Sequence, residues 1–323
     1  MSYLAMLTEK FPIRKSAAQK EAFRAWAVEE MTRLGYQAKV EKNGKSDNIV
    51  AGDPEKAQAV FTAHYDTPAS IGLPNIMIPR NMPLYFAVQL LMVGVLLVVA
   101  FAAALLFELL VPGTTAAPVV GWLVYMCLLM LMLMGPANRH NVNDNTSGVS
   151  AIMETMALIA PEDRDKVAFI LFDNEERGLV GSKAYAKEHL EVQHTRLIVN
   201  LDCVGLGENL LMITPKLAAL QPIYPLLEKA LSDRAAKDEK RKILFFPKKG
   251  SACNSDQKSF RCGVAVMACK KAPVVGYYCD RIHTLWDTEA DEGNLTLLAD
   301  GLSAFAAAIP NNSSQEEEEV GNF

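Results

Sequence analysis

Several features are missing from this 323-residue sequence, and each absence excludes a class of protein. No block of Lys or Arg occurs, because 32 basic and 37 acidic residues are mixed throughout and give a net charge of -5. The chain therefore has no basic track for a phosphate backbone, and we expect no nucleic acid as partner. The six cysteines include no CxxC pair and lie mostly in apolar text, which indicates buried free thiols rather than disulfides or a zinc knuckle.

A cleavable signal peptide is also missing from the beginning of the sequence. The residues MSYLAMLTEKFPIRK contain no charged segment followed by an apolar one. Together with the free thiols, this predicts that the polar part of the chain stays in a reducing compartment.

Positive charge is missing from the middle of the chain, where no Lys or Arg occurs between Asn81 and Asn138. Leu90 to Phe107 are 18 residues without a charged or strongly polar side chain, and a second apolar run, VVGWLVYMCLLMLMLMG, follows the turn VPGTTAAP. With its apolar flanks, each run is long enough to cross a bilayer, whereas buried helices of a water-soluble core usually keep a polar edge. The sequence predicts a transmembrane helical hairpin at residues 83–135.

A hairpin returns the chain to the side of the membrane that it left. Residues 1–82 and 136–310 would therefore share one compartment and form one polar domain, followed by an acidic, disordered tail at residues 311–323. Arg80 and Arg139 flank the hairpin, and the positive-inside tendency places this domain in the cytoplasm. We predict an integral membrane protein with two spans.

Strand-like and helical runs alternate outside the hairpin. SAAQKEAFRAWAVEEMTRLG carries a capping box at Ser16 and Gln19, apolar residues at helical spacing, and a stop at Gly35. The strand-like runs are AQAVFTAH, VAFILF, RLIVNLDCVG and AVMAC, and the helical ones are SGVSAIMETMALIA, GLVGSKAYAKEHL and NLTLLADGLSAFAAAI. This alternation predicts an α/β fold with a mixed, mostly parallel sheet wrapped by helices.

Residues that suit metal chemistry fall in the loops where predicted strands end, which is where ligands bind in open α/β sheets. They are His64 and Asp66 in AVFTAHYD, Asp144 just beyond the hairpin, Asp173 to Glu176 after VAFILF, Asp202 in RLIVNLD, and His283 in DRIHTLWDT. Imidazole and carboxylate ligands together favour two divalent ions, most simply zinc, although other divalent metals stay open.

The order of these fragments closely resembles metallopeptidase family 28, which includes bacterial leucyl aminopeptidase, glutamate carboxypeptidase II and glutaminyl cyclase. The motifs H-x-D, D-N-x-S-G, E-E-x-G-L-x-G-S, N-L-D, S-D-x-x-x-F and I-H-T-x-x-D-T follow one another between residues 16 and 310, hairpin excepted. The resemblance implies a zinc-peptidase fold that carries the hairpin in one of its active-site loops. It also implies that His64 and Asp202 hold one zinc ion, that Glu176 and His283 hold the other, and that Asp144 bridges them.

The resemblance assigns further roles around these ligands. Glu175 would be the general base, and Asp66 would orient the imidazole of His64. Asp256 and Asp287 match the motifs as well, and we expect them to support the site rather than to bind metal. The family often has Asp in place of Asn143 and His in place of Gln257, which leaves the pocket shape open. His140, beside Arg139, is expected to lie away from the site.

These assignments predict a hydrolase. A water held between two zinc ions would lose a proton near neutral pH, and Glu175 would accept it as the peptide carbonyl is attacked. The expected function is a membrane-anchored zinc aminopeptidase that acts on short or hydrophobic peptides, because His64 and Asp144 lie close to the two span ends. The alternatives are an amidase for N-acyl amino acids or lipidic amides and, from another class, a metal-free receptor or scaffold.

The predicted partners are peptide substrates, the lipid bilayer and a second copy of the chain. Small residues at Gly94 and Ala102 to Ala104 would allow close contact between copies in the membrane. Glutaminyl cyclase chemistry is less expected, because that branch of the family works with one zinc ion.

Overall fold

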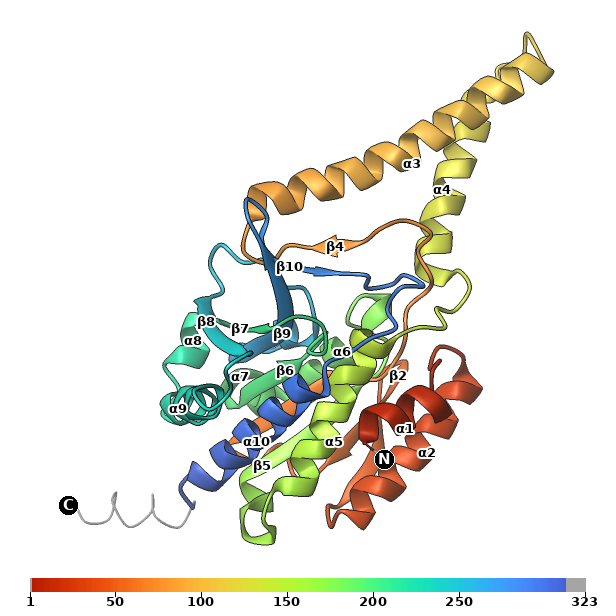
Figure 1. Ribbon diagram of the computed structural model, residues 1–323. Coiled ribbons are helices and arrows are strands. Elements are labelled where there is room, and N and C mark those ends of the chain that lie inside the picture. Colours follow the sequence, from red (N-terminus) through yellow and green to blue (C-terminus); the bar gives the residue numbers. More distant parts are fainter. Residues whose placement is uncertain (1, 312–323) are drawn as a thin grey trace.

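The structure, a computed structural model shown in Figure 1, describes residues 2–311. The predicted acidic tail therefore lies almost wholly outside the described residues. The helices are α1 (Tyr3–Lys10), α2 (Ala17–Arg33), α3 (Met82–Leu110), α4 (Ala117–Met134), α5 (Gly148–Leu158), α6 (Val180–Glu188), α7 (Leu190–Thr195), α8 (Lys216–Ala219), α9 (Tyr224–Ala235) and α10 (Glu292–Ala308). The strands are β1 (Ala38–Asn43), β2 (Ser46–Ala51), β3 (Ala59–His64), β4 (Ile76–Met77), β5 (Val167–Phe172), β6 (Leu197–Leu201), β7 (Asn209–Thr214), β8 (Lys242–Pro247), β9 (Gly263–Ala272) and β10 (Gly276–Asp280).

All ten strands belong to one mixed sheet, in the order β1-β2-β5-β3-β6-β9-β10-β4, with β7 on β9 and β8 on β7. The central strands β5, β3, β6 and β9 are parallel to their neighbours in that series, and antiparallel pairs extend the sheet on both sides. The predicted fold class is confirmed. Because β3 precedes the hairpin and β5 and β6 follow it, the two polar parts of the chain share one sheet.

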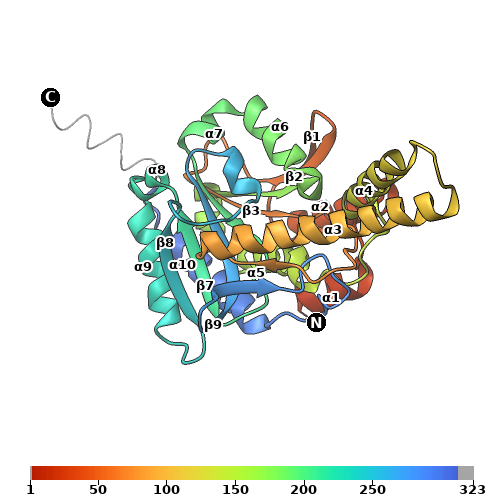
Figure 2. The same ribbon diagram turned by 90° about the horizontal axis from the view of Figure 1, so that it is seen from above.

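Helices cover both faces of the sheet, and aromatic residues fill the two interfaces (Figures 1 and 2). On one face, Phe61 of β3 packs against Phe169 of β5 at 5.6 Å and against Phe305 of α10 at 6.1 Å between ring centroids. On the other face, Phe172 of β5 packs against Tyr185 of α6 at 6.0 Å. Strand β3 is therefore buried on both sides, which explains its continuous apolar sequence.

The helix predicted before the hairpin forms as α2, with its predicted capping box. The Ser16 hydroxyl accepts a hydrogen bond from the backbone N–H of Gln19, and the Gln19 side chain accepts one from the backbone N–H of Ser16. The helix ends before Gly35, which has a φ of +94° and reverses the chain.

The two apolar runs form α3 and α4, which are long and apolar enough to cross a membrane. Only 11% of the most apolar stretch of each helix is buried, so they are not core helices of a water-soluble domain. Figure 1 shows both helices projecting from the sheet domain, with their connecting turn furthest from it. They pack closely at Gly121, where an added Cβ would lie 3.1 Å from the Ala100 carbonyl oxygen and 3.1 Å from the Ala104 Cβ.

The chain that leaves β3 and the chain that returns from α4 are paired before they separate. Ala69 and Ala137 form an isolated antiparallel bridge, and the backbone N–H of Ser70 donates to the Pro136 carbonyl oxygen at 2.9 Å. The segment that contains the hairpin is therefore closed at its base.

Candidate active site

The carboxyl ends of three neighbouring parallel strands bring the predicted site together. His64 is the last residue of β3, Asp173 follows β5, and Asp202 follows β6. Asn174 and Cys203, with φ values of 58° and 55°, turn the chain sharply after β5 and β6. These left-handed conformations are uncommon for residues other than glycine and direct the adjoining acidic side chains into one place.

Asp144 lies between two histidines that come from opposite ends of the sequence. The Nε2 atom of His64 is 3.3 Å from Asp144 Oδ1 and 3.6 Å from Asp202 Oδ1. The Nε2 atom of His283 is 3.0 Å from Asp144 Oδ2 and 3.2 Å from Glu176 Oε2. The two oxygens of Asp144 therefore face different histidines, one on each side of the carboxylate.

These groups have the composition and spacing of metal sites. The ligand atoms of three sets of side chains lie within 4.8 Å of one another: His64, Asp144 and Asp202; Asp144, Glu176 and His283; and His64, Glu175 and Glu176. Two buried oxygens, Glu176 Oε1 and Asp202 Oδ1, have no hydrogen-bond partner among the described residues. Buried carboxylate oxygens without a donor are costly unless a cation compensates them, and nitrogen with oxygen ligands suits zinc. The residues fit a pair of divalent ions.

The charges of the cluster shift the pKa values of its members in opposite directions. Burial, reinforced by neighbouring carboxylates, raises the pKa of Glu175 well above its usual value and that of Glu176 to about 8. Burial alone would lower the pKa of His64 and His283, but nearby carboxylates raise both, that of His283 to about 9. Burial alone would raise the pKa of Asp144, but His283 and His64 outweigh it and lower that pKa. Four carboxyl groups and two histidines share this cluster, a composition that favours a bound cation.

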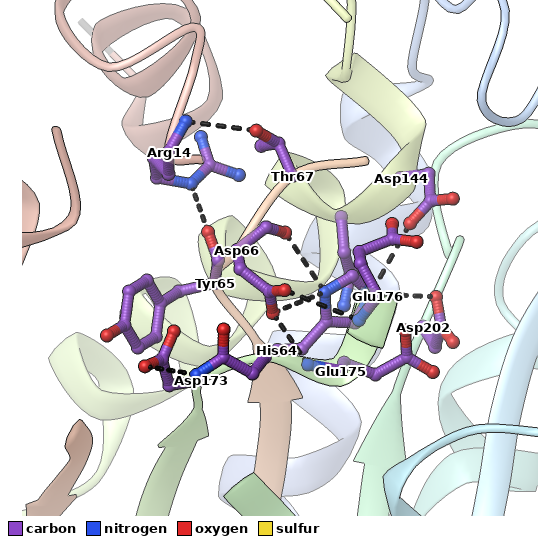
Figure 3. A network of polar contacts seen from close by, with 12 residues as sticks. Arg14, His64, Tyr65, Asp66, Thr67, Asp144, Asp173, Glu175, Glu176 and Asp202 are labelled. Carbon is purple, nitrogen blue, oxygen red and sulfur yellow. Dashed lines mark hydrogen bonds and ion pairs between the residues drawn. The ribbon is translucent and has the colours of Figure 1, made fainter. Parts of the chain in front are cut away.

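Asp66 fixes the loop that carries both glutamates (Figure 3). Its Oδ1 atom accepts the backbone N–H of Glu175 at 2.9 Å, and its Oδ2 atom accepts that of Glu176 at 3.3 Å. The same Oδ1 lies 3.6 Å from Nδ1 of His64, which is nearer to the Asp66 carbonyl oxygen at 3.1 Å. Asp66 therefore orients the glutamate loop directly, a role that the sequence did not predict, and contacts His64 more through its backbone than through its carboxylate.

Asp287 fixes the bridging carboxylate in a similar way. Its Oδ1 atom accepts the backbone N–H of Asn143 at 2.8 Å, and its Oδ2 atom accepts that of Asp144 at 2.9 Å. Asp256 is fully buried, neither of its oxygens has a hydrogen-bond partner among the described residues, and burial raises its pKa to about 7. Neither belongs to the grouped ligand atoms.

The two departures from the family pattern are both used in hydrogen bonds. The Asn143 Oδ1 atom accepts the backbone N–H of Gly205 at 2.8 Å, and its Nδ2 atom donates to Cys279 Sγ at 3.5 Å. The Gln257 Oε1 atom accepts from Asn200 Nδ2 at 3.1 Å. Each amide thus connects loops around the site. His140 is exposed and belongs to none of the ligand groups.

Two buried cations support the site and were not predicted. Arg14 is fully buried, and its Nε atom donates to the Tyr65 carbonyl oxygen at 2.5 Å, directly after His64. Lys20 forms a buried ion pair with Asp173, 2.6 Å from Nζ to Oδ1. Nothing in the sequence distinguishes Arg14 from surface arginines, but Lys20 occupies the same helical stripe as the buried Phe23 and could have been found by that signal.

The site opens into a cavity of about 290 Å³ that extends to the apolar hairpin. Its floor contains His64, Asp144, Glu175, Asp202 and His283. Its other walls include side chains from α3 and α4.

Histidine and carboxylate groups gathered at the ends of parallel strands suit a metal-dependent enzyme. The family model of peptidase family M28 matches residues 132–306, more than half of the chain. The chain therefore belongs to peptidase family M28. No curated protein sequence matches it significantly.

Solved structures share the fold at low sequence identity. Glutaminyl cyclase from Bacteroides thetaiotaomicron is 15% identical with a TM-score of 0.57, and the match covers 95% of this chain and 96% of the cyclase. The LapA aminopeptidase of Legionella pneumophila is 16% identical with a TM-score of 0.53, covering 94% of this chain and 69% of LapA. LapB from the same organism is 13% identical with a TM-score of 0.54, covering 94% and 69%. These similarities establish the fold.

Proposed function

We propose that the chain is a membrane-anchored, zinc-dependent aminopeptidase that removes N-terminal residues from short or hydrophobic peptides. The observation that carries the proposal is the position of Asp144, whose two oxygens lie 3.3 Å from His64 Nε2 and 3.0 Å from His283 Nε2. Family membership supports peptide hydrolysis, and the cavity that joins the site to the hairpin supports apolar substrates.

In this proposal His64, Asp202, Glu176, His283 and the shared Asp144 are the residues that would hold the zinc. Bound zinc would acidify water at the site and polarise the scissile carbonyl. Glu175 lines the cavity, and burial raises its pKa well above the usual value. Glu175 lies beside the residues that would hold the metal, so its carboxylate would accept a proton from the attacking water and return it to the leaving amine.

The variant Glu175→Gln tests this mechanism, since it keeps the size of the side chain but cannot accept the proton. We expect hydrolysis of unblocked peptides to fall at least about 100-fold while bound zinc, measured by atomic absorption, stays unchanged. Glu162→Gln, at an exposed glutamate far from the cluster, is the matched control. Undiminished hydrolysis by Glu175→Gln would remove Glu175 from the mechanism.

The substrate class and the metal count separate the alternatives. An aminopeptidase hydrolyses free N-termini and rejects N-acetylated peptides, whereas an amidase for N-acyl amino acids prefers the blocked ones. The similarity to glutaminyl cyclase makes cyclisation of peptides with N-terminal glutamine the second reaction to assay. Two zinc ions per chain would favour hydrolysis, and a chain that binds no zinc would favour a receptor or scaffold.

The membrane anchor rests on the length and exposure of α3 and α4. Among the six cysteines, only Cys127, in α4, is exposed. We expect Cys127 to resist a water-soluble maleimide in membranes and to react after detergent unfolding, with the protein remaining in the pellet after alkaline carbonate extraction. Rapid labelling in intact membranes, or release by carbonate, would refute the anchor.

A further inference from the structure

The roof of the active-site cavity comes from the apolar hairpin rather than from the sheet domain. Tyr85, Gln89 and Met92 of α3 and Met132 of α4 face the same cavity as His64 and Glu175. The three α3 residues are spaced by four and then three positions, so they share one face of the helix. Figure 2 shows the first half of α3 crossing above the sheet.

The extra length of α3 is what places this face over the site. Helix α3 has 29 residues and α4 has 18, a difference of 11 residues, or about 16 Å at 1.5 Å per residue. The cavity residues Tyr85, Gln89 and Met92 all lie in the first half of α3. This end of the helix therefore serves the cavity, while the distal end packs on α4 near Gly121.

Gln89 is an unusual residue for this helix. It interrupts a run from Met82 to Phe107 that is otherwise apolar except for Tyr85. Within residues 2–311, its side chain has no hydrogen-bond partner, and Gln89 lines the cavity. Glutamine in such a helix is costly and points to function. A side-chain amide offers one acceptor and donors, the complement of a peptide group.

Methionines form an adaptable part of the cavity wall, beside polar residues such as Asn75 and Asn254. Met77, Met92, Met132 and Met267 line it, from β4, α3, α4 and β9. Methionine has a flexible, polarisable side chain that adjusts to apolar groups of different shape. A volume of about 290 Å³ lies at the small end of ligand pockets, which suits a short stretch of peptide.

We propose that the hairpin roof is a substrate subsite of the enzyme. Met92 and Met132 of the hairpin, together with Met77 and Met267 of the sheet domain, enclose a large apolar N-terminal side chain, and Gln89 hydrogen-bonds the main chain of the residues that follow. The subsite rests on the proposed function, because it defines which peptides reach Glu175. The hairpin is then part of substrate selection as well as an anchor.

The role of the Gln89 amide is tested by measuring peptide binding in a variant that cannot hydrolyse the peptide. In the full chain carrying Glu175→Gln, reconstituted with zinc in phosphatidylcholine nanodiscs, we measure the affinity of Leu-Gly-Gly by calorimetry with and without Gln89→Leu. We expect Gln89→Leu to weaken binding about five- to ten-fold, the size of one hydrogen bond. Leucine suits the helix, so unfolding is not expected, and an unchanged thermal midpoint verifies it. Equal affinity in the two proteins would overturn the role of Gln89.

The role of the four methionines is tested by measuring which N-terminal residues the active enzyme prefers. We expect Met92→Ala to reduce the preference for N-terminal Leu over N-terminal Ala, as a ratio of kcat/KM, about ten-fold. Leu91→Ala, at a neighbour that is 67% exposed, is the matched control and should leave the ratio unchanged. Equal ratios for Met92→Ala and the parent would refute the role of the methionines in binding the N-terminal side chain. Absence of peptide hydrolysis by the parent would instead refute the proposed function, while the calorimetric comparison would still decide the role of Gln89.

Discussion

The substitution Asp66→Asn should weaken metal binding although Asp66 is not a predicted ligand. Its carboxylate accepts the backbone N–H groups of Glu175 and Glu176 at 2.9 and 3.3 Å. An asparagine has one acceptor oxygen and one NH₂ donor, so one backbone N–H would face a donor. Leaving such a buried group unpaired costs about 1–3 kcal/mol, or roughly 5- to 150-fold in an equilibrium constant.

The loss should appear in the affinity for zinc, because the loop that moves carries Glu176. We expect a 10- to 100-fold weaker zinc affinity, measured by competition with a chromogenic chelator, and a similar fall in peptide hydrolysis at limiting zinc. Asp53→Asn, at a site whose carboxylate pairs with exposed Lys56, is the control and should change neither value. If Asp66→Asn bound zinc as tightly as the parent, the hydrogen bonds to the glutamate loop would not position the ligands.

Three further predictions concern stability. Lys20→Met should lower the free energy of unfolding by about 3 kcal/mol, because it leaves Asp173 buried without its cation. The control Lys56→Met, at an exposed ion pair, should lower it by less than about 0.5 kcal/mol. Urea unfolding in detergent compares the two variants, and equal losses would contradict the value for Lys20→Met. Burial, followed by the charges of nearby acids, raises the pKa of Glu154 to about 7 in the folded protein. The unfolded chain releases this proton near pH 4.5, so the folded protein loses stability as pH rises from about 4.5 to 7. Glu154→Gln should therefore stabilise the protein by about 1 kcal/mol at pH 8, after discounting for partial exposure, and have little effect at pH 4. Thermal midpoints of the variant and the parent at both pH values test this prediction, and an equal shift of the midpoint at the two pH values would refute it. Gly121→Leu should force α3 and α4 apart and increase protease cleavage of the hairpin in detergent, whereas unchanged cleavage would contradict the close packing.

The strand-end part of the site was predictable from sequence for a definite physical reason. Short, β-branched and aromatic runs such as VAFILF are typical of buried strands in a covered sheet, and parallel neighbours place their carboxyl ends together. His64, Glu176 and Asp202 therefore had to approach one another once β3, β5 and β6 paired. The motif resemblance supplied what periodicity cannot, namely that the loop residues Asp144 and His283 join the same group. Their assignment as metal ligands stays a prediction.

Other parts could not be predicted, because they depend on contacts between distant segments. The strand pair β7 and β8 was missed, although LLMIT and KILFF are apolar enough to suggest strands. The path of α3 over the cavity depends on Arg80, whose Nη1 donates to Ser251 Oγ at 2.6 Å and whose guanidinium lies 4.5 Å from the Phe246 ring centroid. No local pattern specifies such a contact.

The paired backbone at Ala69 and Ala137 has a consequence for how this chain could have been assembled in evolution. The backbone is already hydrogen-bonded between Ser70 and Pro136. A short turn could therefore connect these two residues in place of the long segment that contains the hairpin. Insertion or loss of this segment would also add or remove β4, which pairs with β10, and several residues that line the active-site cavity. The two apolar helices and part of the active-site wall would therefore be gained or lost together.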